Sequence, residues 1–143
     1  MISATFVTAG RAVFTADSPK GQHFTFKVRK KEMPAKGQFP ARTMFFVSAR
    51  SAQRYEYVGV LDARTGVLRA TRGSKFGDQS QVFKVAFFVL ARIWQQRDLP
   101  DGYTVKHEGK CGRCARRLTD PVSIDMGIGP DCAEQMGLTR RAA

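Results

Sequence analysis

The sequence predicts an α+β protein in which a small antiparallel β-sheet packs on one long helix, followed by a compact module that contains the cysteines. Three observations lead to this prediction. Residues 11–71 contain short segments of alternating apolar and polar residues separated by turn signals, residues 81–97 carry apolar residues at helical spacing, and all three cysteines lie between residues 111 and 132. A chain of 143 residues is long enough for one domain with a small appended module.

Strands are predicted at 11–16, 23–30, 43–49, 55–61 and 67–71. The first two flank the turn-forming residues 18–21, so they should form a hairpin. In the second segment Phe24, Phe26 and Val28 alternate with Lys27 and Arg29, which predicts one core face and one wet, basic face. Residues 30–41 contain two prolines and a glycine among charged residues and predict an exposed loop.

One long helix is predicted at 81–97, after a polar connection whose Asp78 or Ser80 can cap it. Its apolar residues recur at helical spacing and should form a broad stripe that packs on the sheet. We expect Trp94 and the Phe87–Phe88 pair to fill the core, because a ring that stacks on bases must be exposed. The helix should end at the residues DLPDG, 98–102.

The chain is strongly basic, with 24 Lys and Arg against 12 Asp and Glu, a net charge of +12 and a pI near 10.3. Residues 1–100 carry +11 of this charge and residues 101–143 only +1. Such a balance favours a polyanionic partner, nucleic acid first and an anionic membrane second. No apolar run approaches the ~20 residues that span a bilayer, and the N-terminus has no basic region typical of a secretory signal. We therefore expect a cytoplasmic protein without a membrane partner.

The cysteines follow the pattern H-x3-C-x2-C-x17-C, formed by His107, Cys111, Cys114 and Cys132. A C-x2-C turn lets two sulfurs converge on one ion, and tetrahedral Zn²⁺ accepts this arrangement readily. An odd number of cysteines cannot all pair in disulfides, and a reducing cytoplasm also favours thiolates held by a metal.

The segment between the cysteines is rich in helix start and stop signals. Asp120 and Pro121 should begin a short helix that ends at Gly127, and Pro130 should open a second helix that closes near Gly137. The third cysteine would then lie in the first turn of that second helix and face the C-x2-C turn. This is the treble-clef way of completing a zinc site, so we expect a treble-clef-like zinc module at 101–138, after a basic α+β domain at 1–100 and before a basic tail at 139–143.

The fourth zinc ligand is predicted to be His107, because structural zinc sites usually have four protein ligands. Asp131 and a water molecule are the alternatives, and the plainest alternative to a metal site is three unrelated reduced cysteines. The signature of base deaminases is absent, and a hydrolytic zinc would need an open position beside a base such as Glu108 or Asp131. We therefore expect Zn²⁺ to have a structural role.

Residues 107–132, HEGKCGRCARRLTDPVSIDMGIGPDC, resemble a zinc-binding domain of unknown function that is common in proteins of actinobacterial phages and their hosts. The matching signature is HEGxCGRCxRxLTxPxSIxxGxGPxC, and with the preceding helix and linker the resemblance covers about residues 80–137. One departure is Ala115, where the family usually has glycine, and this could strain the turn. Similar modules are appended to phage replication or helicase-like proteins, so the resemblance implies a phage origin and an association with nucleic acid.

Together these observations predict a non-catalytic nucleic-acid-binding protein in the cytoplasm of a bacterial host cell. They favour neither DNA nor RNA, and neither single nor double strands. An alternative is a phage inhibitor or adaptor that binds a host protein or immune complex, since the chain shows no catalytic constellation. A metal-dependent nuclease is the weakest alternative, because no acidic or histidine cluster stands apart from the zinc ligands. The predicted phosphate contacts are Lys27, Arg29, Lys30, Lys31, Arg113, Arg116 and Arg117.

Overall fold

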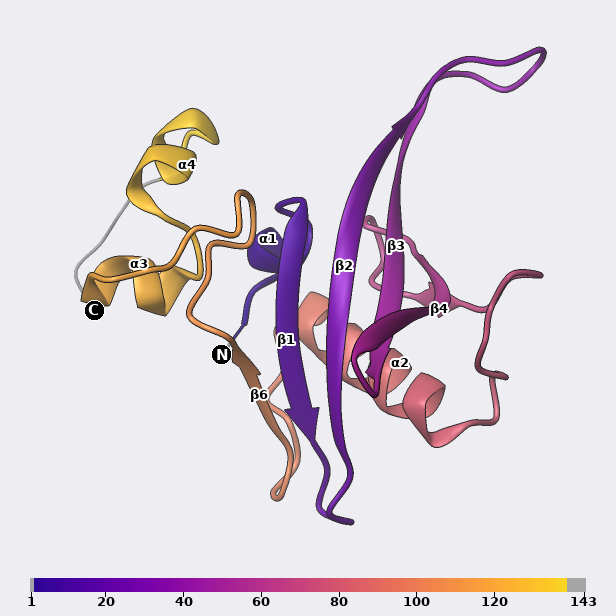
Figure 1. Cartoon of the computed structure of the whole chain (residues 1–143), viewed down its shortest axis with the longest axis horizontal. Coiled ribbons are helices and arrows are strands. Elements are labelled where there is room, and N and C mark those ends of the chain that lie inside the picture. Colours follow the sequence, from indigo (N-terminus) through magenta and orange to yellow (C-terminus); the bar gives the residue numbers. More distant parts are fainter. Residues whose placement is uncertain (1, 139–143) are drawn as a thin grey trace.

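The computed structural model describes residues 2–138 and shows a mixed α/β fold built on a six-stranded antiparallel sheet (Figure 1). The strand order is β5-β4-β3-β2-β1-β6. The elements in chain order are α1 (Ala4–Val7), β1 (Arg11–Asp17), β2 (His23–Met33), β3 (Arg42–Ser51), β4 (Arg54–Leu61), β5 (Leu68–Arg69), α2 (Gln81–Trp94), β6 (Thr104–His107), α3 (Pro121–Met126) and α4 (Pro130–Gln135).

The sheet is larger than the sequence predicted, and the helix is shorter. The five predicted strands are present, but β2 continues three residues further, to Met33, and β6, which follows α2 in the sequence, adds a sixth strand. The α-helical conformation of α2 ends at Trp94, and Gln96 then has a φ of 54°, which no helix accommodates. The helix therefore stops three residues before the predicted end at 97.

One face of the sheet is covered by α2, which crosses behind β1, β2 and β3 in the view of Figure 1. Of the two predicted caps, Ser80 is the residue used: its side chain accepts a hydrogen bond from the Phe83 N–H at 3.2 Å. Strand residues that alternate along β1 to β4 pack against the apolar stripe of the helix. Fully or nearly fully buried members of this core are Phe14, Phe26, Val28, Val47, Val58, Leu61, Val89, Leu90 and Ile93.

Of the aromatic residues of α2 that were predicted to fill the core, Phe87 departs from this role, whereas Phe88 and Trp94 pack against the core. Phe87 is 41% exposed, because it lies on the outer side of the helix. Trp94 is half-buried, and its indole N–H donates to the carbonyl oxygen of Ala63 at 2.7 Å. Its ring lies so close to Gly66 that a Cβ there would stand 2.5 Å from the Trp94 side chain. Through these two contacts Trp94 packs the turn after β4, which contains Ala63 and Gly66, against the end of α2.

Strands β2 and β3 extend beyond the rest of the sheet as a two-stranded arm (Figure 1). The predicted loop at 30–41 forms this arm, because residues 30–33 continue β2 and pair with β3. At its tip Lys36 and Phe39 exchange two backbone hydrogen bonds of 2.9 Å. The Phe39 ring is 66% exposed and lies 5.7 Å from the Arg42 guanidinium.

The N-terminal segment contains a helix that sequence reasoning missed. The four residues of α1 are capped by Ser3, whose side chain accepts from the Phe6 N–H at 3.2 Å. Phe6 is 1% exposed and its ring centroid lies 5.6 Å from that of His107. This short helix therefore packs between the sheet and the segment that carries the cysteines.

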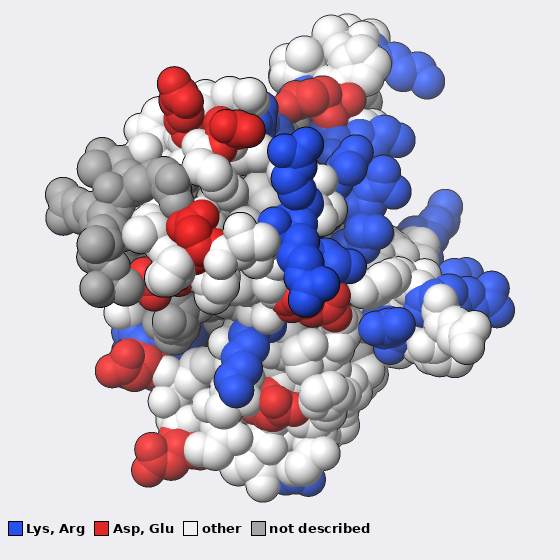
Figure 2. Space-filling model, turned by 60° about the vertical axis from the view of Figure 1, so that its left-hand side comes forward, with Lys and Arg blue, Asp and Glu red and all other residues white. Residues whose placement is uncertain are grey.

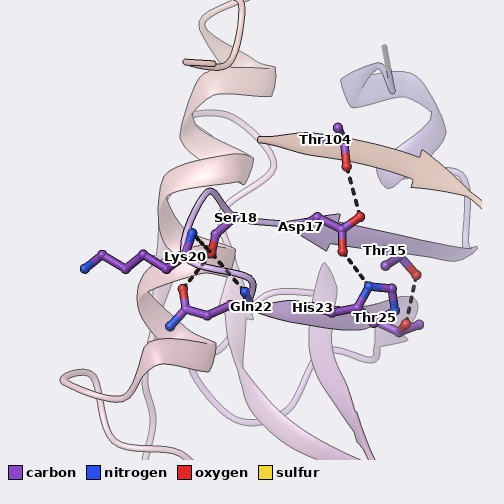
Figure 3. A network of polar contacts seen from close by, with 8 residues as sticks. All are labelled: Thr15, Asp17, Ser18, Lys20, Gln22, His23, Thr25 and Thr104. Atoms are coloured by element: carbon purple, nitrogen blue, oxygen red, sulfur yellow. Dashed lines mark hydrogen bonds and ion pairs between the residues drawn. The ribbon is translucent and has the colours of Figure 1, made fainter. Parts of the chain in front are cut away.

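Strand β6 pairs with β1, which brings residues far apart in the sequence side by side. The Asp17 carboxylate of β1 accepts a hydrogen bond from Thr104 Oγ1 of β6 (2.9 Å) and lies 2.5 Å from Nδ1 of His23 on β2 (Figure 3). Its side chain therefore connects three adjacent strands. The Oγ1 atoms of Thr15 and Thr25 form a further cross-strand hydrogen bond of 2.8 Å. These polar contacts fix the register of β6, β1 and β2 at this end of the sheet.

Within residues 2–138, no helix has both the length and the apolar character needed to cross a bilayer. The predicted basic tail at 139–143 lies outside the described residues. The predicted division of the chain at residue 100 remains a prediction, but β6, on the far side of that boundary, is part of the main sheet.

Candidate metal centre and basic sheet face

The three cysteines come together in one cluster. Their Sγ atoms lie within 4.8 Å of one another, with Cys111 and Cys132 buried and Cys114 exposed. Three thiolates at this separation could hold one metal ion. Among the residues that the structure describes, this is the one group of His, Cys, Asp and Glu side chains with such a geometry.

The C-x2-C turn is built directly after β6. The Cys111 N–H donates to the Arg116 carbonyl oxygen (2.8 Å), and the Ala115 N–H donates to the Cys111 carbonyl oxygen (2.9 Å). Lys110 and Arg117 form a bridge that closes the turn at its base. Ala115 has a φ of 66°, the left-handed conformation that glycine adopts without strain. Glycine would therefore suit this position better than alanine does.

Two short helices return the chain to the turn, as the sequence predicted. Asp120 caps α3 by accepting from the Ser123 N–H at 2.9 Å, and Gly127 ends it with a φ of 73°. Pro130 then begins α4, which places Cys132 in its first turn. The Gly112 N–H donates to the Gly127 carbonyl oxygen at 2.9 Å, so the end of α3 is tied to the centre of the C-x2-C turn.

Backbone N–H groups surround the Cys111 sulfur. Burial raises the pKa of this thiol, but hydrogen bonds from the backbone N–H groups of Gly129, Cys114 and Arg113 lower it by more, so the net pKa is lowered. For Cys132 burial dominates and raises the pKa, against a hydrogen bond from the Arg113 side chain that lowers it. Donors aimed at sulfur are what a metal-bound thiolate requires from its surroundings.

His107 is not brought into the cysteine cluster. Its Nδ1 accepts a hydrogen bond from the Gly109 N–H (2.9 Å), and its Nε2 lies 2.6 Å from the Ile124 carbonyl oxygen. An acceptor at Nδ1 leaves the proton on Nε2, so the neutral imidazole donates to Ile124. The side chain therefore links the end of β6 to α3, with both nitrogens engaged.

A pocket of about 180 Å³ opens beside the three cysteines. Asp131, one of the alternative fourth ligands, lines it and is exposed. Arg116 and Arg117 also line it and are exposed, so their guanidinium groups can reach a phosphate. Arg113 is placed differently: its Nη1 donates to Gln135 Oε1 at 2.5 Å, and its side chain hydrogen-bonds Cys132. This arginine supports the cluster instead of projecting freely.

The second group of predicted site residues lies on the sheet face that α2 does not cover, which we call the open face. Lys27, Arg29 and Lys31 alternate along β2 and project from this face, since the intervening Phe26 and Val28 are fully buried in the core. Lys30 projects from the opposite face, where its Nζ lies 3.8 Å from Glu32 Oε1. Lys30 is therefore separated from the other three predicted residues.

Strand pairing adds basic residues to the open face that sequence reasoning missed. On β1, Arg11 lies opposite Arg29. On β3, Met44 is the partner of Lys31, and Arg42 lies two residues before it, on the same face. Arg50, also on β3, pairs with Tyr55 of β4. Lys106 of β6 lies opposite Thr15. The alternation within each strand shows which of its residues share a face, but the strand order is needed to know that these faces lie on the same side of the sheet. Figure 2 shows many Lys and Arg side chains gathered in a band on one side of the view, with most Asp and Glu away from it.

Residues 104–137 match a family of unknown function (DUF6011). The matched segment begins with β6 and ends just after α4, so it contains the whole cysteine cluster. No curated protein and no solved structure matched the chain. The match covers 34 of the 143 residues, and strands β1 to β5 lie outside it.

Proposed function

We propose that this is a non-catalytic nucleic-acid-binding protein in which the open face of the sheet contacts phosphates and a structural Zn²⁺ folds the C-terminal module. The observation that carries the proposal is the concentration of Lys27, Arg29 and Lys31, with basic neighbours from β1, β3 and β6, on the sheet face opposite α2. A one-sided basic surface attracts polyanions and gains affinity from released counterions. The signature in residues 107–132 supports a phage origin and a place in the bacterial cytoplasm.

The metal part of the proposal assigns Cys111, Cys114 and Cys132 as ligands of Zn²⁺ in a treble-clef-like arrangement. The buried sulfurs, the N–H donors around Cys111 and the helix that presents Cys132 support this assignment. Because both nitrogens of His107 are occupied, the fourth position falls to Asp131 or to water in the adjoining pocket. When bound, Zn²⁺ would offset two of the three thiolate charges and tie α4 to the C-x2-C turn.

Charge reversal tests the nucleic-acid part. The double variant Lys27→Glu/Arg29→Glu should weaken binding of a fluorescein-labelled oligonucleotide at least tenfold and lower the slope of log affinity against log salt by about 1–2, because two phosphate contacts are lost. The matched control is Lys84→Glu/Arg97→Glu, which changes the net charge equally at exposed positions in and just after α2. This control should retain at least half of the wild-type affinity in moderate salt.

Two results would overturn the proposal. One is the absence of salt-dependent binding to DNA and RNA at low ionic strength. The other is an equal loss of affinity in both double variants, because this would show that net charge alone, and not the open face, attracts the ligand. Recovery of a host protein that stays bound after nuclease treatment, together with either result, would favour the inhibitor or adaptor alternative.

A further inference from the structure

The open face carries aromatic rings as well as charges. Phe46 of β3 lies opposite Arg29, and Tyr57 of β4 lies opposite Ser48, which is itself the partner of Lys27. The Phe46 and Tyr57 ring centroids are 6.0 Å apart. Tyr55 lies two residues before Tyr57 on the same strand and pairs with Arg50 of β3. Since α2 covers the other face, these rings are not part of the helix–sheet core.

All three rings are half-buried, so each packs on the sheet and keeps part of its surface accessible. Tyr57 is the most engaged, because its hydroxyl hydrogen-bonds Thr71 Oγ1 at 2.9 Å and its ring lies 3.8 Å from the Cβ position of Gly73. Tyr55 instead lies beside the Lys27 ammonium, and Phe46 lies beside the Tyr57 ring and opposite Arg29. These two residues are the stronger candidates for contact with a ligand.

Basic side chains and aromatic rings of the open face lie in contact with one another. The Nζ of Lys27 lies 5.3 Å from the centre of the Tyr55 ring, although the two residues come from β2 and β4. In the register Ser48 of β3 lies between Lys27 and Tyr57, and Arg50 pairs with Tyr55, so the contact from Lys27 to Tyr55 runs diagonally across β3. Burial raises the pKa of Tyr55, and the charge of Glu108 raises it further, so the phenol stays neutral at physiological pH and adds no negative charge to the basic face.

The open face ends in a basic hollow. Beside the base of the arm a pocket of about 490 Å³ is lined by Arg42 and Met44 of β3, by Val60 of β4 and by Arg69 of β5. Arg64, from the turn after β4, lines it too and is exposed. Asp62 lines it as well and forms an ion pair with Arg64 (Nε to Oδ1, 3.5 Å), so Arg42 and Arg69 supply the guanidinium groups that are suited to a phosphate group.

Resting on the proposed function, we infer that the open face binds single-stranded nucleic acid, with bases stacked on Tyr55 and Phe46 and the backbone held by Lys27, Arg29 and Arg50. Aromatic rings interleaved with basic side chains on a sheet are how proteins bind unpaired bases, because every base has a face that can stack. In a duplex these faces are already stacked on one another and cannot reach a ring. The hollow then receives a phosphate at one end of the strand, held by Arg42 and Arg69.

The experiment compares four fluorescein-labelled probes of about 20 nucleotides, longer than the ~4–16 nucleotides that one OB fold covers. They are an oligo-dT, an oligo-rU, a DNA duplex and an abasic strand that has the same phosphates but no bases. The wild-type protein should bind the two single strands at least tenfold more tightly than the abasic strand, and more tightly per phosphate than the duplex. Comparison of the affinities for oligo-dT and oligo-rU shows whether the protein prefers single-stranded DNA or RNA.

Variants locate the stacking surface. The change Tyr55→Leu/Phe46→Leu should weaken oligo-dT binding about tenfold or more while leaving the salt slope unchanged, because no charge is removed. Tyr55→Phe keeps the ring and should bind as the wild type does. Phe87→Leu is the matched control, since this ring is exposed on the opposite side of the molecule. Thermal unfolding of each variant verifies that the fold is retained.

The results separate this inference from the function on which it rests. Equal affinity for the abasic strand and the oligo-dT, or unchanged binding by Tyr55→Leu/Phe46→Leu, would overturn base stacking on the open face. If Lys27→Glu/Arg29→Glu still weakened binding in that case, nucleic-acid binding by the basic face would stand. If neither Lys27→Glu/Arg29→Glu nor Tyr55→Leu/Phe46→Leu weakened binding of oligo-dT, both the stacking inference and the proposed function would be overturned.

Discussion

A methyl group on Gly127 would stand 2.5 Å from Cδ1 of Phe6. The same ring would be 2.7 Å from a Cβ on Gly112. Phe6 therefore occupies the space between the C-x2-C turn and the end of α3, and both glycines are needed for its close approach. The ring joins α1, the sheet and the cysteine module into one packed body.

Phe6→Ala should destabilise the whole protein and not the N-terminus alone. Replacing a fully buried phenylalanine by alanine costs about 3–5 kcal/mol through lost burial and the cavity left behind. Urea unfolding followed by circular dichroism measures this free energy. Phe87→Ala, at a ring that is 41% exposed, is the control and should cost far less. Similar small losses in both variants would contradict the packing described for Phe6.

Removal of the metal should unfold the C-terminal module. We expect elemental analysis to find one zinc per wild-type chain and none in Cys132→Ser, because the third sulfur closes the site. A chelator should lower the melting temperature of the wild type and leave that of Cys132→Ser unchanged. Zinc-free wild-type protein with the same melting temperature would refute a structural metal.

His107→Ala should keep the metal but weaken the fold. Loss of the hydrogen bonds to Gly109 and Ile124 should cost roughly 0.5–1.5 kcal/mol each. The absorption spectrum of the Co²⁺-substituted protein reports its ligands directly, and it should be the same in wild type and variant. A changed spectrum with much weaker metal binding would instead identify His107 as the fourth ligand that the sequence spacing favours.

Ala115→Gly should stabilise the protein. A φ of 66° places Ala115 in the left-handed region, which costs a non-glycine residue about 1–2 kcal/mol. Part of this gain is offset by the greater freedom of glycine in the unfolded chain, so we expect an increase of up to about 1 kcal/mol. Differential scanning calorimetry measures it, and Ala35→Gly in the exposed arm is the control. A lower melting temperature for Ala115→Gly would show that the turn is not strained.

The hydrogen bonds from His23 and then Thr104 hold the pKa of Asp17 below its ordinary value of 3.8. A carboxyl with a lowered pKa in the folded state contributes stability above its ordinary pKa, and this contribution disappears as the pH falls through the lowered value. Because the side chain is 43% exposed, Asp17→Asn should cost less than about 1 kcal/mol at pH 7.

The difference between wild type and Asp17→Asn should therefore shrink as the pH falls below about 4. Denaturant unfolding at a series of pH values measures it. Asp125→Asn, at an exposed position of α3, serves as the comparison. A pH-independent difference would assign the effect of Asp17→Asn to packing.

Local signals in the sequence predicted most elements. Alternation identified the strands, and the capping signals at Asp120, Gly127 and Pro130 located both short helices of the module. The cysteine spacing predicted the sulfur cluster, since C-x2-C and a capped helix are local devices. The N-terminal helix was missed because four residues carry too little periodicity to indicate one.

Non-local contacts could not be read from the same signals. Pairing of β6 with β1 joins Thr104 to Asp17 across the length of the chain, and nothing in either segment specifies that partner. The spacing of His107 before the cysteines was compatible with a ligand, but the hydrogen bonds that orient its ring come from Gly109 and Ile124. Lys30 and Lys31 are neighbours in sequence and were predicted together, yet the pleat of β2 sends them to opposite faces.

The placement of β6 gives the C-terminal module a protective role. Without β6, the N–H and C=O groups along one side of β1 would have no partner, and such an uncovered strand recruits the strand of another molecule. At the other border, β5 has two residues and offers little to pair with. A chain that ended before residue 104 would therefore expose β1 as a template for intermolecular pairing, and self-association would compete with folding.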